Sequence, residues 1–160
     1  MSALQMSKTV YDQIRASGEQ CYPHEACGVL FGRPGVEGWV VTHAISAANA
    51  DKESPQLRYR IEPLELVRIQ SLAAREGLEI AGFYHSHPDH PAQWSPTDLA
   101  EAHWLGCSYV ITAVSSGKAT LTCSFLLAGT REEDKRFEAE VLWVEEVSFP
   151  TSHLHRISSI

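Results

Sequence analysis

The first apolar stripe of the chain has helical spacing. Met6, Val10 and Ile14 recur every fourth residue, and Gly18 follows them. Side chains at this spacing lie on one face of an α-helix, and a glycine commonly ends such a helix. The pattern therefore predicts an amphipathic helix of about four turns that ends at a cap formed by Gly18.

A second helix is predicted in the middle of the chain. Pro63 suits the first position of a helix, because its missing N–H has no partner to lose there. Leu64, Val67 and Leu72 mark one apolar face of this segment. The helix is expected to end near Gly77.

Short runs rich in Val and Ile alternate with turn residues along the rest of the chain. They predict strands over residues 25–32, 39–46, 58–61, 78–85, 108–115 and 118–128. Turns that contain glycine join the first two and the last two of these runs into hairpins. Residues 95–106 predict a third helix, residues 47–58 predict an exposed loop, and residues 137–147 fit a strand only in part, because glutamate is frequent in them.

This mixture of helices, strands and hairpins predicts an α+β fold, with helices packed on a mixed β-sheet. The length of 160 residues suits one domain, which we place at residues 1–147, followed by a C-terminal tail at 148–160. A domain of this size buries enough surface to be stable without disulfides or a structural metal.

Composition narrows the classes of function. The net charge of −7 argues against a general nucleic-acid-binding protein, which would carry a basic stripe. No run of residues is long and apolar enough to span a bilayer, and the first residues do not have the pattern of a secretory signal. The four cysteines show no CxxC spacing and are expected to be reduced. Together these features predict a cytoplasmic protein without a membrane or nucleic-acid partner.

The segment HSHPDHPAQWSPTD, residues 85–98, has a composition that a simple turn does not need. His85 and His87 follow a predicted strand, and residues two apart on a strand point the same way. Their imidazoles can then converge on one ion, while Ser86 between them faces away. Pro88 is expected to end the strand just past the pair.

Two interpretations of the following SPTD are open. Ser95 suits a helix N-cap, Pro96 the first helical position and Asp98 the third, so a capping box explains the pattern by itself. Alternatively, Asp98 joins the two histidines in a His₂Asp set. Three protein ligands with one open position are the arrangement of a catalytic zinc site.

A zinc hydrolase also needs a general base, and Glu25 is the candidate. It begins an apolar run, HEACGVLFG, that contains no other acidic residue. A surface glutamate that merely precedes a strand is the competing interpretation, and the residues alone favour it.

The combined pattern resembles the JAMM (MPN-plus) zinc metallopeptidases. Their motif E-x-x-G-x-L-x-G, then H-x-H-P and S-x-x-D, is matched here by Glu25, Gly28, Leu30, Gly32, His85, His87, Pro88, Ser95 and Asp98. The order of elements is also similar from the first helix to about residue 127. The resemblance implies a fold like that of cytidine deaminases.

The resemblance further implies a role for each motif residue. His85, His87 and Asp98 would bind one Zn²⁺ per chain, with water as the fourth ligand. Glu25 would take a proton from that water and pass it to the leaving amine, and Ser95 would donate a hydrogen bond to the oxyanion. The compact chain looks most like bacterial members, which implies a partner of a particular kind: a ubiquitin-like sulfur-carrier protein with a C-terminal extension.

Other residues near these motifs are expected to have no metal role. His24 should point away from the metal, and His90 is expected to be an exposed loop residue. His153 and His155 form a second HxH without a partner acid and are interpreted as surface residues. Trp94 either packs on the loop or contacts substrate.

Three rival functions remain open. Zinc deamination would need a P-C-x-x-C motif, which is absent. A non-enzymatic scaffold with a relic pocket would usually have lost ligands, whereas every position of the motif is filled here. The RadC-like group has a similar motif but normally carries Asn where this chain has Ser86.

Overall fold

The computed structural model describes residues 1–146 of the chain. Its elements are β1 (Ala3–Ser7), α1 (Lys8–Cys21), β2 (Cys27–Pro34), β3 (Trp39–Ala47), α2 (Pro63–Arg75), β4 (Glu79–Pro88), α3 (Pro96–Glu101), β5 (Ser108–Ser115), β6 (Lys118–Ala128), a 3₁₀ turn (Glu132–Asp134) and β7 (Arg136–Glu145). The predicted tail and its residues His153 and His155 lie outside the described part, so the boundary at residue 147 stays a prediction. Within residues 1–146 no helix has the length and apolar character needed to cross a membrane.

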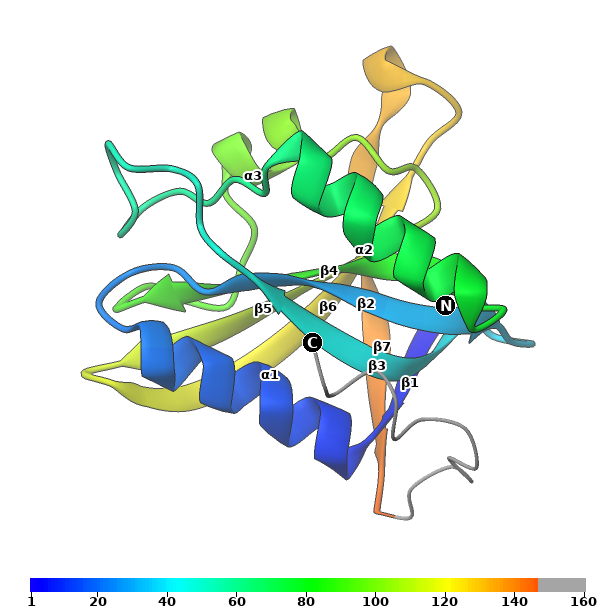
Figure 1. Ribbon diagram of the computed structural model, residues 1–160, viewed down its shortest axis with the longest axis horizontal. Helices are drawn as coiled ribbons and strands as arrows, with labels where there is room; N and C mark the ends of the chain where they lie inside the picture. The colour runs from blue at the N-terminus through cyan, green and yellow to red at the C-terminus, as the bar shows by residue number, and fades with distance from the viewer. Residues whose placement is uncertain (147–160) are drawn as a thin grey trace.

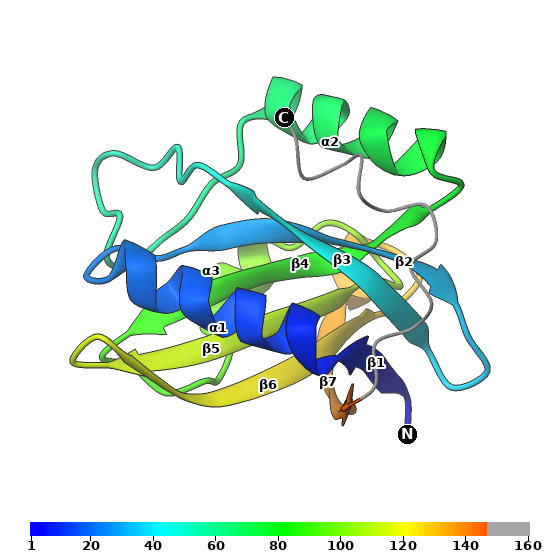
Figure 2. The same ribbon diagram turned by 60° about the horizontal axis from the view of Figure 1, so that its bottom comes forward.

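The strands form one mixed sheet in the order β1-β3-β2-β4-β5-β6-β7, and its edges meet to close a barrel. β1 pairs in parallel with both β3 and β7, and β4 pairs in parallel with β5. Figures 1 and 2 show α1 on one face of the sheet and α2 on the other, with α3 on the same side as α2 in Figure 1. The predicted α+β fold with a mixed sheet is confirmed, closure into a barrel was not predicted, and the likeness to cytidine deaminases stays a prediction.

Two apolar layers lie on the two faces of the sheet. Beneath α1 the layer contains Val10, Ile14, Leu30, Ala81, Tyr84 and Val110. Beneath α2 it contains Val29, Phe31, Ile69, Ala73, Phe83 and Tyr109. Because side chains alternate along a strand, the residues two and four beyond Phe83 on β4 face the α2 layer. Those residues are His85 and His87.

The predicted first helix is shifted in the structure. Met6 belongs to β1, and α1 begins after Ser7, whose Oγ accepts a hydrogen bond from the N–H of Val10 at 3.2 Å. Met6 is buried in the same layer as Val10. The two apolar residues therefore have helical spacing in the sequence, although Met6 lies on a strand. Gly18 is not the cap, because α1 continues to Cys21. A Cβ at Gly18 would lie 3.2 Å from the Cβ of Ser86, so glycine allows α1 to approach β4 closely.

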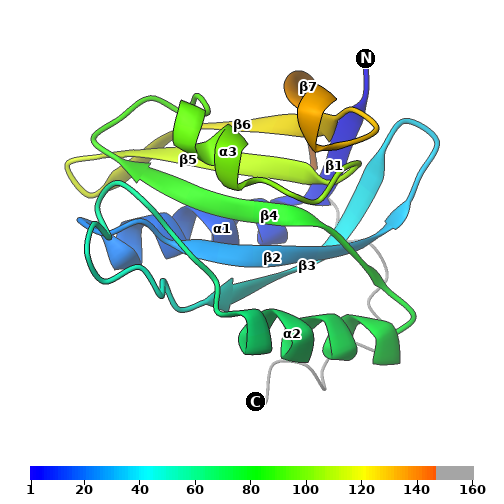
Figure 3. The same cartoon turned by 90° about the horizontal axis from the view of Figure 1, so that it is seen from above.

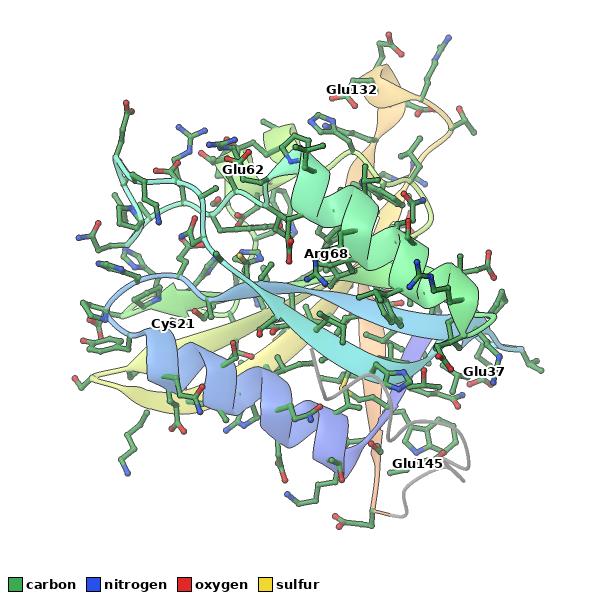
Figure 4. The ribbon with its side chains drawn as sticks, in the orientation of Figure 1. Cys21, Glu37, Glu62, Arg68, Glu132 and Glu145 are labelled. Carbon is green, nitrogen blue, oxygen red and sulfur yellow. The ribbon has the colours of Figure 1, made fainter. Side chains whose placement is uncertain are left out.

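The second helix has the predicted bounds but a different buried face. Pro63 occupies its first turn, and Gly77 follows its end with a φ of +67°. Leu64 and Val67, however, are 84% and 58% exposed. Leu72, the third predicted residue, is partly buried and packs beside Leu66, and the buried face is centred on Ile69 and Ala73. Figure 4 shows Arg68 on this helix among its projecting side chains.

The other differences concern short elements. Residues 58–61 form no strand, and the third helix ends at Glu101 rather than near Gly106. The ambiguous segment near residue 137 is strand β7, in which Glu140 is buried and accepts hydrogen bonds from Ser2 and Ser124. The two predicted hairpins, β2–β3 and β5–β6, are confirmed as antiparallel pairs.

Candidate metal centre

The end of β4 places two histidines side by side. His85 and His87 are buried, and their Nε2 atoms lie 3.1 Å apart. β4 lies between β2 and β5 (Figure 3), with His85 paired to both strands and His87 paired to β5. Pro88 ends the strand, as predicted. Ser86 faces the opposite side, where its Oγ accepts a hydrogen bond from the N–H of Ala26 at 2.8 Å.

The start of α3 brings a carboxylate to this pair. Oδ1 of Asp98 lies 3.3 Å from Nε2 of His85, and Oδ2 lies 3.3 Å from Nε2 of His87. The same residue completes a capping box with Ser95: Oγ of Ser95 accepts from the Asp98 N–H at 3.1 Å, and the Ser95 N–H donates to Oδ2 of Asp98 at 2.7 Å. The two interpretations of SPTD are therefore compatible, because the cap itself aims the carboxylate at the imidazoles.

Glu25 approaches the histidines from the connection between α1 and β2. Its side chain is buried, with the residue only 3% exposed, so the interpretation as a surface glutamate is wrong. Its Oε1 has no hydrogen-bond partner among the described residues. Ligand atoms of Glu25, His85 and His87 all lie within 4.8 Å of one another. The three form a group that could hold a metal ion.

Burial and hydrogen bonding give the two carboxyl groups opposite acidities. Burial raises the pKa of Glu25 to about 8, against the opposing influence of His87. Burial also disfavours the Asp98 anion, but its polar interactions with the His85 and His87 rings outweigh burial and hold the pKa of Asp98 well below its usual range. Asp98 is thus a preformed anion, whereas Glu25 readily holds a proton.

The pKa values of the two histidines are also shifted in opposite directions. Burial lowers the pKa of His85. Burial acts in the same direction on His87, but hydrogen bonds with Asp98 and the Pro91 carbonyl raise its pKa overall. Because Nδ1 of His87 donates to the Pro91 oxygen at 2.8 Å, its Nε2 is left with a lone pair in the neutral form. This tautomer is the one required of a ligand that binds through Nε2.

The donor set fits a small divalent cation. Tetrahedral ligands at about 2.0–2.1 Å from zinc lie roughly 3.3–3.4 Å from one another. The observed separations of 3.1 Å between the imidazole nitrogens and 3.3 Å from each to a carboxylate oxygen are close to this edge length. Two nitrogen lone pairs directed at each other over such a distance repel unless a proton or a cation lies between them. A cation beside Glu25 would also favour its ionised form.

Ser95 keeps a free donor despite its role as the cap. The cap uses an oxygen lone pair of its hydroxyl, which accepts from the Asp98 N–H, so the hydroxyl hydrogen can donate elsewhere. Ser95 is partly exposed beside the buried histidines. The position is suited to a hydrogen bond to a ligand that enters the centre.

The neighbouring polar residues stay outside the centre. His24 is exposed, and His90 is exposed with its Nδ1 donating to the Pro88 carbonyl at 2.7 Å, in agreement with the predictions. Trp94 is 37% exposed, and its ring packs against that of Phe137 with the centroids 5.6 Å apart. All four cysteines are free thiols, and Cys27 and Cys107 are buried.

Sequence reasoning missed one residue at the centre. The ring of Tyr59 stacks on that of His85, with centroids 4.5 Å apart and planes inclined by 25°. The sequence predicts a short strand at Tyr59, and no metal-binding motif lies near it in the chain. A contact between residues so far apart in the chain leaves no local pattern to find.

Comparison with known proteins adds independent findings. A family model described as prokaryotic homologues of the JAB domain matches residues 7–143. A desampylase of Haloferax volcanii is 36% identical over 89 residues, which cover 56% of this chain and 62% of that protein. The chain thus matches less than two thirds of that relative's length. A probable TtuB-protein conjugate cleaving protease of Thermus thermophilus is 34% identical over 118 residues, covering 74% of this chain and 75% of that protein.

Solved structures support the same fold. A solution structure of a Desulfitobacterium hafniense protein has a TM-score of 0.80 and 27% identity, and the match covers 95% of this chain and 99% of that one. A solution structure of a Salinibacter ruber protein has a TM-score of 0.67 and 32% identity, over 93% and 96% of the two chains. The likeness therefore extends over nearly the whole of each chain.

Proposed function

Because this chain belongs to the prokaryotic JAB family, we propose that it is a zinc-dependent peptidase or isopeptidase acting at the C-terminus of a ubiquitin-like protein. The observation that carries this proposal is the convergence of His85, His87 and Asp98 beside the buried carboxyl of Glu25. In a protein whose three ligands leave one position open, the metal is available for catalysis rather than for structure alone.

Zinc is the proposed ion because it accepts imidazole nitrogen and carboxylate oxygen in four-coordinate sites. His85, His87 and Asp98 would hold it, one ion per chain. When bound, zinc lowers the pKa of a coordinated water to about 7 and polarises a carbonyl group. The remaining steps belong to side chains of the protein.

Glu25 is proposed as the group that moves the proton. Its carboxyl is buried next to the histidines, and burial favours the protonated form once it has accepted a proton. Such a carboxyl can take a proton from the attacking water and return it to the leaving amine. Asp98, whose anion is stabilised by its hydrogen bonds, is unsuited to that exchange and suited to binding a cation.

Ser95 is proposed to stabilise the oxyanion. Negative charge develops on the carbonyl oxygen during amide hydrolysis, and a fixed hydroxyl donor lowers the energy of that state. The capping box holds the Ser95 side chain at the start of α3, so little reorganisation is needed. The hydroxyl hydrogen, which the cap does not use, supplies the hydrogen bond.

The proposed substrate is a ubiquitin-like sulfur-carrier protein that carries a C-terminal extension or is conjugated to another protein. The Thermus relative is named for cleaving TtuB-protein conjugates, and the Haloferax relative is named a desampylase. An extended C-terminal tail of such a protein is narrow enough to enter a centre that lies at the end of a strand. A cytoplasmic location is also proposed, because all four cysteines are free thiols.

The test is incubation of the purified protein with ubiquitin-like carriers that bear a C-terminal extension, followed by intact mass measurement. We expect release of the extension by the wild-type protein and none by Glu25→Gln. An unchanged mass with every carrier, in protein that contains stoichiometric zinc, would overturn the proposed function and favour a non-enzymatic scaffold.

A further inference from the structure

We infer that residues 48–62, which we call the strap, are a positioning device for the metal centre: Tyr59 fixes the ring of His85, and Asn49 fixes the backbone of Glu25. The strap connects β3 to α2 and forms no helix or strand. Glu62 in Figure 4 marks its entry into α2, and Cys21 marks the end of α1, from which the chain leads to Glu25. The inference rests on the proposed zinc site and adds to it residues that are not ligands.

The first contact of the strap orients a histidine. Metal-binding histidines usually donate their second ring N–H to an acceptor, which fixes the ring. His87 does so through the Pro91 carbonyl, but Nδ1 of His85 is buried and has no hydrogen-bond partner within residues 1–146. The ring of Tyr59 instead lies against that of His85 at 4.5 Å. Stacking therefore restricts the His85 ring where a hydrogen bond does not.

The second contact holds the segment that carries the proposed base. The Glu25 N–H donates to the carbonyl of Pro55 at 2.7 Å, and the Glu25 carbonyl accepts from Nδ2 of Asn49 at 3.3 Å. Both polar groups of the Glu25 backbone thus bond to the strap. Ala26, the next residue, bonds to Ser86 of β4, whereas the N–H and carbonyl of Glu25 itself bond only to the strap among the described residues.

Asn49 also holds the strap together. Its Nδ2 donates to the carbonyl of Arg58 at 2.9 Å, and its Oδ1 accepts from the N–H groups of Asp51 and Arg60 at 3.0 and 3.1 Å. These bonds bring together the two ends of a segment that has no regular structure. They place Tyr59, which lies between Arg58 and Arg60, at the ring of His85.

A third contact connects the strap to the helix that carries Asp98. The Arg58 guanidinium forms an ion pair with Glu101 at the end of α3. The strap therefore reaches all three segments that supply the centre: the Glu25 connection, β4 and α3. This exposed ion pair is a minor contribution by itself, because solvent screens it.

The decisive test compares Tyr59→Leu with Tyr59→Phe. Loss of the ring should weaken Zn²⁺ affinity about 10- to 100-fold, the usual effect of removing a group that orients a ligand. Phenylalanine keeps the stacking face and should retain wild-type affinity. Leu57→Ala is the matched control, because the Leu57 side chain lies in the strap but is 64% exposed. Affinity is measured by competition with a chromophoric chelator, and Co²⁺ spectra report the coordination geometry.

Asn49→Asp tests the second contact without reference to metal or substrate. The substitution removes both donors of the amide but keeps an oxygen for the Asp51 and Arg60 N–H groups. We expect hydrogen exchange at the Glu25 amide to become roughly fivefold faster, because a local restraint is lost, while exchange in the centre of β4 is unchanged.

The outcomes separate the inference from the proposed function. Wild-type Zn²⁺ affinity and Co²⁺ spectra in Tyr59→Leu, or unchanged Glu25 exchange in Asn49→Asp, would overturn the inference while leaving hydrolysis intact. If Zn²⁺ affinity depends on Tyr59 as predicted but no carrier is hydrolysed, the positioning role of the strap is supported and the proposed function is wrong. Absence of zinc binding by the wild-type protein would overturn both.

Discussion

Two carboxyl groups approach the same pair of imidazoles under opposite conditions. Asp98 lies at the start of a helix, accepts a hydrogen bond from the Ser95 N–H, and lies 3.3 Å from each histidine Nε2. Glu25 is buried outside any regular element, and its Oε1 has no partner in the described part of the chain. The first environment stabilises an anion and the second disfavours one.

The difference indicates a division of roles. A carboxyl group that binds a cation must be ionised, which the environment of Asp98 ensures. A group that accepts and returns a proton must have a pKa near the working pH. Burial raises the pKa of Glu25 to about 8, and a cation beside it would lower that pKa again, toward neutral pH. Exchanging the roles would leave a carboxylate with a very low pKa as base and a protonated carboxyl as ligand. The comparison thus predicts separable effects for the two residues.

The largest effect is expected from Asp98→Ala. Removal of this anion takes away a proposed ligand and half of the capping box, so zinc content should fall from about one ion per chain to near zero, with loss of all hydrolysis. Elemental analysis of the dialysed protein measures it. His90→Ala removes an exposed histidine of the same loop and should retain zinc. Full zinc content in Asp98→Ala would show that Asp98 is no ligand.

Glu25→Gln should leave zinc in place and still abolish most turnover. The amide cannot accept the proton, and loss of a general base typically slows a reaction about 10²- to 10⁴-fold. Zinc content and cleavage rate are measured on the same preparation. Loss of zinc from this variant would show that Glu25 is a ligand rather than the base. A wild-type rate would show that it is neither.

Ser95→Ala should have a somewhat smaller effect on turnover. Loss of one oxyanion donor costs about 10²- to 10³-fold, and loss of the cap costs about 1 kcal/mol of stability. Ser95→Thr keeps both the cap acceptor and the hydroxyl donor, and should restore most of the rate. If Ser95→Thr were as slow as Ser95→Ala while retaining zinc, hydrogen bonding by the hydroxyl would not explain the loss.

The smallest effect concerns stability after removal of metal with a chelator. Because burial raises the pKa of Glu25 from 4.5 to about 8, the folded state binds this proton more tightly than the unfolded state does. This contribution is complete below about pH 4.5 and is lost as the pH rises toward 8. Glu25→Gln should therefore exceed the wild type in unfolding free energy by about 3–4 kcal/mol at pH 8, and differ little at pH 4.5. Urea unfolding at both pH values measures this difference. A pH-independent difference would contradict the environment assigned to Glu25.

Local chemistry made part of this molecule predictable. Pro63 and Gly77 bounded a helix because proline and glycine have strict backbone preferences, and the alternation of β4 paired His85 with His87. Ser95 and Asp98 were found because a cap has a fixed spacing. Each of these features depends on residues that are neighbours in the chain.

Long-range packing explains what was not predicted. Met6 matched a helical stripe because β1 and α1 contribute to the same apolar layer. The backbone of Glu25 bonds to the strap, which lies far along the chain and has a polar sequence typical of an exposed loop. The face of α2 was misassigned because Leu64 and Val67 are as apolar as residues that pack against the sheet. The spacing of apolar residues alone does not distinguish a helix from a strand followed by a helix, or a packed apolar side chain from an exposed one.

X-ray absorption at the zinc edge tests the central claim most directly. The account predicts one zinc per chain, four-coordinate, with only nitrogen and oxygen neighbours at about 2.0–2.2 Å and the multiple-scattering signature of two imidazoles. Cys27 is paired with His85 across β2 and β4, so sulfur is the donor that the spectrum must exclude. A sulfur neighbour at about 2.3 Å, or a spectrum without the imidazole signature, would contradict the His85–His87–Asp98 centre.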